Sequence, residues 1–160
     1  MPVRQSLPRF NRRQAMCASL SLLLLPVAAQ TRPDAPLVEV WKSPTCGCCN
    51  DWIAHLEANG FRTRTHDTGN DAMRRRLGVP LQYGSCHTAR VAGYAIEGHV
   101  PAADIQRLLA TRPKAIGLAV PGMPIGSPGM DGPEYGGRKD PYDVLRIAAD
   151  GSASLFQSHR

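Results

Sequence analysis

The chain has little of what nucleic-acid binding requires. Only 6% of its 160 residues are aromatic, and much of its formal charge of +6 comes from four arginines near the amino end, Arg4, Arg9, Arg12 and Arg13. Beyond them, 15 basic residues stand against 13 acidic ones, which leaves a charge of about +2. No basic stripe is interleaved with aromatic side chains, so binding to a phosphate backbone is not expected.

The sequence also lacks an apolar run long enough for a membrane-spanning helix. Residues 15–25 are almost wholly apolar, but a bilayer span needs about 18 or more such residues. Arg12-Arg13 precede this run, and the small residues of Val27-Ala28-Ala29 follow it, which is typical of a secretory signal. We therefore predict export to the periplasm by the general secretory or the twin-arginine route, with no membrane insertion after the leader is removed. The predicted parts are a signal peptide over residues 1–29, a linker over 30–36 and one domain over 37–160.

Cysteines are few and too unevenly spaced for a disulfide scaffold. Cys17 lies in the predicted leader, which leaves Cys46, Cys48, Cys49 and Cys86 in the domain. Three of these four fall within four residues, where adjacent Cys48 and Cys49 could pair only through a strained geometry. A disulfide-stapled interaction module is therefore the hypothesis that fits the spacing least, even in an oxidising compartment.

Hydrophobic periodicity predicts an α/β domain with a mixed sheet flanked by helices. A long loop rich in glycine and proline, over residues 121–141, precedes a C-terminal hairpin. Strands are predicted at 37–41, 61–66, 88–92, 94–97, 117–120, 142–148 and 152–156, and helices at 49–59, at 70–77 and after Pro101. The cysteine cluster then lies at the joint between the first strand and the first helix.

Thiolates at the start of a helix suit either disulfide exchange or binding of a soft metal, because the helix N-terminus stabilises negative sulfur. Cys46 and Cys49 form a C-x-x-C pair, which is typical of redox proteins with a thioredoxin-like fold. Cys48 adds nothing that a two-thiol exchange requires, but its sulfur can bridge two metal ions. We therefore favour metal binding, with a thiol or copper-linked oxidoreductase using Cys46 and Cys49 as the alternative.

The softness of the donors favours copper(I) as the metal. Four thiolates could also hold zinc, but structural zinc sites usually use two spaced pairs rather than three cysteines plus one. Met123 and Met130 lie in the long loop, where their thioethers could bind copper(I) or simply fill gaps in the core. The predicted metal ligands are Cys46, Cys48, Cys49 and Cys86, with Met123 and Met130 as auxiliary candidates.

The histidines and the arginine run carry weaker signals. His87 follows Cys86 directly, so in a strand its side chain would point to the opposite face, and we expect a hydrogen-bonding or surface residue rather than a ligand. His55 is expected to be solvated, and the run Arg74-Arg75-Arg76 to form an exposed helix face. No spacing signal attaches to His66, His99 and His159.

Four motifs together resemble the CopG-type copper-resistance family: residues 43–49 (SPTCGCC), 85–89 (SCHTA), 97–101 (EGHVP) and the loop over 120–130. The resemblance covers residues 38–156. It implies a thioredoxin-like fold, a periplasmic role in copper handling and a polynuclear copper cluster bridged by cysteines. By position, the family's cysteines correspond to Cys46, Cys48, Cys49 and Cys86. The implied partners are copper ions and other periplasmic copper-handling proteins.

Overall fold

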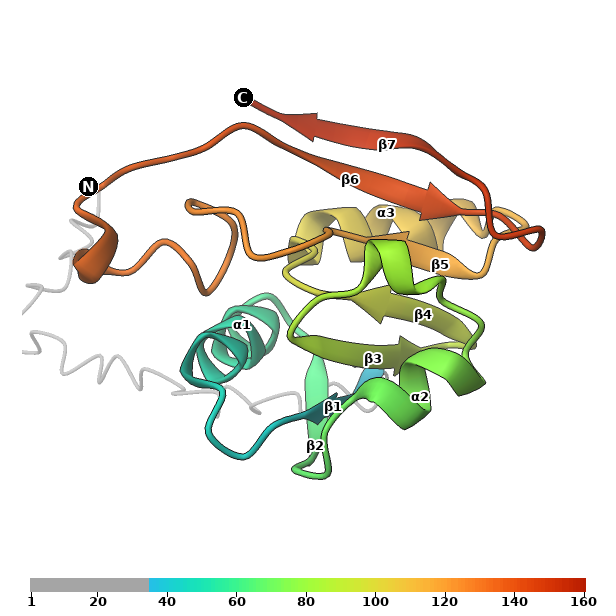
Figure 1. Ribbon diagram of the computed structural model, residues 1–160, viewed down its shortest axis with the longest axis horizontal. Helices are drawn as coiled ribbons and strands as arrows, with labels where there is room; N and C mark the ends of the chain where they lie inside the picture. Colours follow the sequence, from blue (N-terminus) through green and yellow to red (C-terminus); the bar gives the residue numbers. More distant parts are fainter. Residues whose placement is uncertain (1–34) are drawn as a thin grey trace, which may run out of the picture. The chain divides into compact units, whose positions relative to one another are not determined.

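Seven strands in one mixed sheet organise the chain in the computed structural model, which describes residues 35–160 (Figure 1). The strands are β1 (Leu37–Lys42), β2 (Arg62–His66), β3 (His87–Val91), β4 (Tyr94–Glu97), β5 (Gly117–Ala119), β6 (Tyr142–Ile147) and β7 (Ala153–His159). The helices are α1 (Gly47–Ala58), α2 (Asp71–Arg76) and α3 (Ala102–Thr111), with 3-10 turns η1 (Leu81–Tyr83) and η2 (Pro133–Tyr135).

The strand order across the sheet is β2-β1-β3-β4-β5-β6-β7. β1 runs parallel to β2, and β4 runs parallel to β5. The other neighbouring pairs are antiparallel, including the two hairpins β3–β4 and β6–β7. The predicted mixed α/β fold is therefore confirmed, together with its C-terminal hairpin.

Helices cover both faces of the sheet. On one face, Trp52 of α1 and Ile105 of α3 pack in a core cluster with Ile96 of β4. Ala95, the neighbour of Ile96 on the same strand, instead belongs to a second cluster with Val79, just beyond α2. Adjacent strand residues face opposite sides of a pleated sheet, so α1 and α3 lie on one side and the α2 segment on the other.

Several element boundaries differ from the prediction by one to three residues. α1 begins at Gly47 rather than at Cys49, because Cys46 takes the N-cap position. β7 continues to His159, and the loop over residues 121–141 contains the short turn η2. The predicted signal peptide and most of the predicted linker lie outside the described residues. No helix within the described range is long and apolar enough to cross a membrane.

Candidate metal centre

Strand pairing brings the fourth cysteine to the other three. Cys46 caps α1 just beyond the end of β1, so the cysteine-rich turn lies at the carboxyl end of that strand. β3 pairs antiparallel with β1, with His87 opposite Lys42. Cys86 immediately precedes His87, and it therefore lies at the same end of the sheet as Cys46.

The four sulfurs converge to within 4.8 Å of one another. Cys46 and Cys49 are joined by a disulfide, while Cys48 and Cys86 are free thiols. Each free thiol lies next to one half of the disulfide: the distance between Sγ atoms is 3.6 Å for Cys48 and Cys46, and 3.5 Å for Cys86 and Cys49. The cluster therefore contains both thiols and a disulfide.

Two histidines complete the cluster, and both differ from the sequence expectation. Nε2 of His99 lies 3.0 Å from Sγ of Cys86, and Nδ1 of His87 lies 3.5 Å from the same sulfur. Both side chains are fully buried. The strand argument for His87 was wrong because β3 begins at His87 itself, so the alternation of a strand does not extend back to Cys86.

The hydrogen bond of His99 decides which of its nitrogens faces the sulfur. Nδ1 lies 2.7 Å from the carbonyl oxygen of Pro128. A carbonyl only accepts hydrogen bonds, so Nδ1 carries the proton and Nε2 presents a lone pair to Cys86. Burial lowers the pKa of His99, and lowers that of His87 further, so both imidazoles are neutral. Neutral imidazole with its second nitrogen held by a carbonyl is the usual form of a histidine metal ligand.

His87 lies in an apolar environment with one nitrogen free. The ring of Trp52 packs against it with centroids 4.2 Å apart, and Nε1 of Trp52 donates to the carbonyl of Val100. Among the described residues, Nε2 of His87 has no hydrogen-bond partner. A buried polar atom without a partner is rare in proteins. This nitrogen is therefore a further candidate donor atom for a metal ion.

The glycine-rich loop lies against the cluster. Gly129 adopts φ +84°, and a Cβ there would lie 2.5 Å from the carbonyl oxygen of Cys48. Met130 follows Gly129, and its Sδ accepts a hydrogen bond from the hydroxyl of Tyr135 (3.4 Å). Met123 is 50% exposed in the same loop. The loop therefore covers the start of α1, with Met130 next to the point of contact.

The free thiol of Cys86 is held in its protonated form. Burial, followed by the charge of Cys48, raises the pKa of Cys86 to about 12. Its proton is therefore available for a hydrogen bond to Nε2 of His99. A metal ion that binds this sulfur has to displace the proton, so metal binding here is coupled to proton release.

Two further expectations are corrected by the structure. His55 is only partly exposed, and its Nε2 accepts a hydrogen bond from the backbone N–H of Ala102 at the start of α3 (3.1 Å). Arg74 is buried, whereas Arg75 and Arg76 are exposed as predicted. The pattern of one helix face could not reveal these contacts, because His55 bonds to α3 and Arg74 bonds to Glu97 of β4, both distant in sequence.

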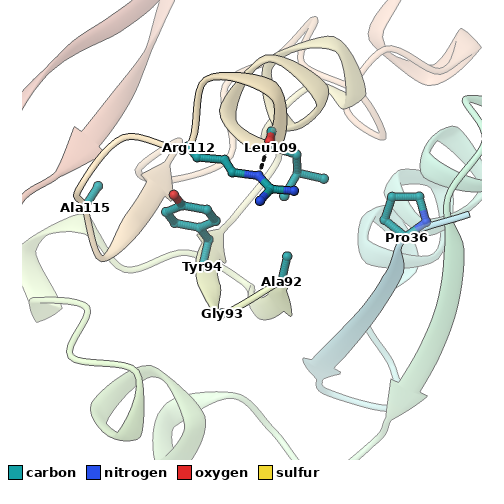
Figure 2. A pocket seen from close by; sticks show the side chains of 7 residues that line it. All are labelled: Pro36, Ala92, Gly93, Tyr94, Leu109, Arg112 and Ala115. Atoms are coloured by element: carbon teal, nitrogen blue, oxygen red, sulfur yellow. Dashed lines mark hydrogen bonds between the residues drawn. The ribbon is translucent and has the colours of Figure 1, made fainter. Parts of the chain in front are cut away.

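A pocket of about 540 Å³ is lined by none of these groups (Figure 2). Its lining is Pro36, Ala92, Gly93, Tyr94, Leu109, Arg112 and Ala115. The hydroxyl of Tyr94 is already bonded to the carbonyl of Pro113, and Nε of Arg112 donates to the carbonyl of Leu109. Because its lining contains no cysteine or histidine, the pocket is not part of the metal centre.

Comparison with known proteins gives one family model and two solved structures. The family model, described as protein of unknown function DUF411, matches residues 83–130, which include Cys86, His87 and His99. The two structures are forms 2 and 1 of copper resistance protein CopG, each with a TM-score of 0.73. Form 2 is 45% identical and the match covers 79% of this chain and 100% of that one. Form 1 is 46% identical, with 79% and 98% covered. No curated protein sequence matches this chain.

Proposed function

Because this chain belongs to the family of copper resistance protein CopG, we propose that it binds copper(I) in the periplasm as part of copper resistance. The observation that carries the proposal is the convergence of the sulfurs of Cys46, Cys48, Cys49 and Cys86 to within 4.8 Å. Thiolates separated by such distances can bridge neighbouring ions, so the proposed cargo is a cluster of several copper ions.

The chemistry of the donors supports copper(I) over zinc. Soft thiolate sulfur is the preferred ligand of copper(I), and the imidazoles of His87 and His99 adjoin the sulfur of Cys86. A structural zinc site needs four donors in a closed tetrahedron, whereas this cluster offers more donors than one such ion uses. Met123 and Met130 remain auxiliary candidates.

Binding requires the reduced form of the protein. The disulfide between Cys46 and Cys49 removes two of the four thiols from coordination, and thiolates rather than disulfide sulfurs bind metals. The reduced full chain, titrated with copper(I) without oxygen, should bind more than one equivalent. Metal analysis after reductive purification should find copper and no stoichiometric zinc.

The control is a variant with Cys46, Cys48 and Cys49 all changed to serine. Uptake in this variant should fall by at least half, because three of four sulfurs are removed. Uptake equal to that of the parent, or no copper(I) binding by the reduced parent, would falsify the proposal.

A second candidate function, thiol–disulfide exchange, is favoured by the disulfide between Cys46 and Cys49. Cys46 is the N-cap of α1, where the helix N-terminus stabilises a thiolate leaving group. The strand order β2-β1-β3-β4 with a cysteine pair at the start of α1 also supports the inferred thioredoxin-like core.

Replacing Cys48 by serine separates the two functions. An oxidoreductase that uses Cys46 and Cys49 should keep its rate of insulin reduction within about twofold, since its two reacting sulfurs are unchanged. A copper cluster should instead lose at least one equivalent of copper(I), because Cys48 supplies a bridging sulfur. Loss of exchange activity with unchanged copper uptake would contradict both assignments of Cys48.

A further inference from the structure

A buried ion pair lies next to the segment that carries Cys86. Glu97, at the end of β4, is 0% exposed, and Arg74, in α2, is 7% exposed. Nε of Arg74 donates to Oε1 of Glu97 at 2.8 Å. Burying two charges costs desolvation energy that the pair's attraction often does not recover. The presence of this pair therefore points to a role other than stability alone.

The pair holds both backbone polar groups of Ser85, the residue before Cys86. The N–H of Ser85 donates to Oε1 of Glu97 (2.7 Å), and its carbonyl accepts from Nη2 of Arg74 (2.6 Å). On the other side of Cys86, the hydroxyl of Thr88 donates to Oε2 of Glu97 (2.6 Å). One carboxylate thus fixes the chain both before and after Cys86.

Two glycines pack closely against the segment that carries Cys86. Gly98 adopts φ +70°, and a Cβ there would lie 2.6 Å from Cβ of Ser85. A Cβ on Gly84 would lie 3.3 Å from Cζ of Arg74. The side-chain amide of Asn70 also donates to the carbonyl of Ser85 (3.1 Å). Movement of Cys86 would therefore require breaking the hydrogen bonds of the ion pair.

We propose that Arg74 and Glu97 are positioning residues for Cys86. By bonding the backbone of Ser85 and the side chain of Thr88, they keep Sγ of Cys86 3.5 Å from Sγ of Cys49 and 3.0 Å from Nε2 of His99. Burial raises the pKa of Glu97, while Thr88, the Ser85 amide and Arg74 lower it. All three partners are donors, which matches a carboxylate that only accepts. The first of the two tests below rests on the proposed copper binding, and the second does not.

Glu97→Gln and Arg74→Lys disturb the pair with little change in volume. The side-chain amide introduced by Glu97→Gln would place a donor among donors, and a lysine lacks the planar fork that bonds Glu97 and Ser85 together. Asp104→Asn is the matched control, because Asp104 is 5% exposed and bonded to His159 and Arg107, away from Cys86. Having two variants keeps the test valid if Glu97→Gln does not fold.

The first test measures copper(I) affinity by competition with a chelator under reducing conditions. Glu97→Gln and Arg74→Lys should each weaken affinity about 10- to 100-fold, the usual effect of removing support from a ligand, and Asp104→Asn less than about twofold. In a Cys86→Ser background, Glu97→Gln should have no further effect, because the group that it positions is gone. An undiminished loss in that background would overturn the inference.

The second test needs no metal, so it decides the inference even if the wild-type protein fails to bind copper. With Cys46 and Cys48 changed to serine, Cys49 and Cys86 should form a disulfide in equilibrium with glutathione. The two protein thiols are oxidised to the disulfide, and one oxidised glutathione is reduced to two glutathione thiols. Glu97→Gln should lower the equilibrium constant for forming the Cys49–Cys86 disulfide about 10-fold, roughly the effect of losing one hydrogen bond that holds Cys86 in place, and Asp104→Asn should not. If Glu97→Gln lowers only the free energy of unfolding, with an unchanged equilibrium, the positioning role is overturned.

Discussion

At the scale of single residues, the proton on Cys86 links the histidines to the proposed metal chemistry. Its pKa of about 12 keeps the thiol protonated, and the lone pair on Nε2 of His99 lies 3.0 Å away. A copper ion that replaces this proton would find a sulfur and a neutral imidazole already in place. The orientation of His99 depends on the carbonyl of Pro128, so a residue of the distant loop selects the nitrogen that faces the cluster.

His55 provides a pH-dependent contribution to stability outside the cluster. Burial lowers its pKa, although Asp131 acts in the opposite direction. Its neutral Nε2 accepts the N–H of Ala102, which protonation would prevent. The unfolded chain binds a proton near the ordinary pKa of about 6.5, before the folded chain does. The contribution is therefore complete above about pH 6.5 and is lost as the pH falls toward the lowered folded pKa.

We expect His55→Gln to flatten the fall in the free energy of unfolding between about pH 7.5 and 5, measured by urea denaturation of the reduced protein. His87 and His99 contribute with the same sign, so only the difference between parent and variant reports on His55. His55→Ala should also cost about 1 kcal/mol at about pH 7.5, because the N–H of Ala102 loses its acceptor. Identical pH slopes in parent and His55→Gln would contradict the assignment.

The residue patterns available in the sequence explain why the cysteines were found together and the histidines were not. Three cysteines within four residues form a local pattern, which needs no knowledge of the fold. His99 reaches Cys86 only because the hairpin β3–β4 places residue 98 beside residue 87, where the N–H of Gly98 donates to the carbonyl of His87. The two strands were predicted, but the contact also depends on the register of their pairing, which the predicted strand limits did not fix.

At the scale of elements, strands and helices followed from periodicity, while the long loop did not. β3 and β4 are joined by a two-residue turn at Ala92-Gly93, where the prediction had placed Ala92 in the strand. Residues 121–141 have no hydrophobic period, so their path depends on tertiary contacts. The hydroxyl of Ser85 donates a hydrogen bond to the carbonyl of Gly122, and Nδ1 of His99 donates one to the carbonyl of Pro128. These contacts hold the loop against the candidate metal centre.

At the scale of the whole molecule, sheet order was the least predictable feature. Adjacent hairpins are local, but β1 pairs with β3 and β4 with β5 across intervening helices. Those pairings depend on how α1 and α3 pack on one face and the α2 segment on the other. They also determine the proposed site, because β1–β3 pairing alone brings Cys86 to the amino end of α1.

The proposed ligands therefore come from segments that only the folded chain brings together, which predicts strong stabilisation by copper. A ligand that binds only the folded state stabilises it by about 4 kcal/mol at a free concentration about 1,000 times its Kd. For the reduced protein, Tm should rise by roughly 10 °C or more in calorimetry without oxygen. Protein kept oxidised should show a much smaller rise, since the disulfide occupies Cys46 and Cys49. Equal shifts in both forms would mean that copper binds elsewhere, away from the clustered thiols.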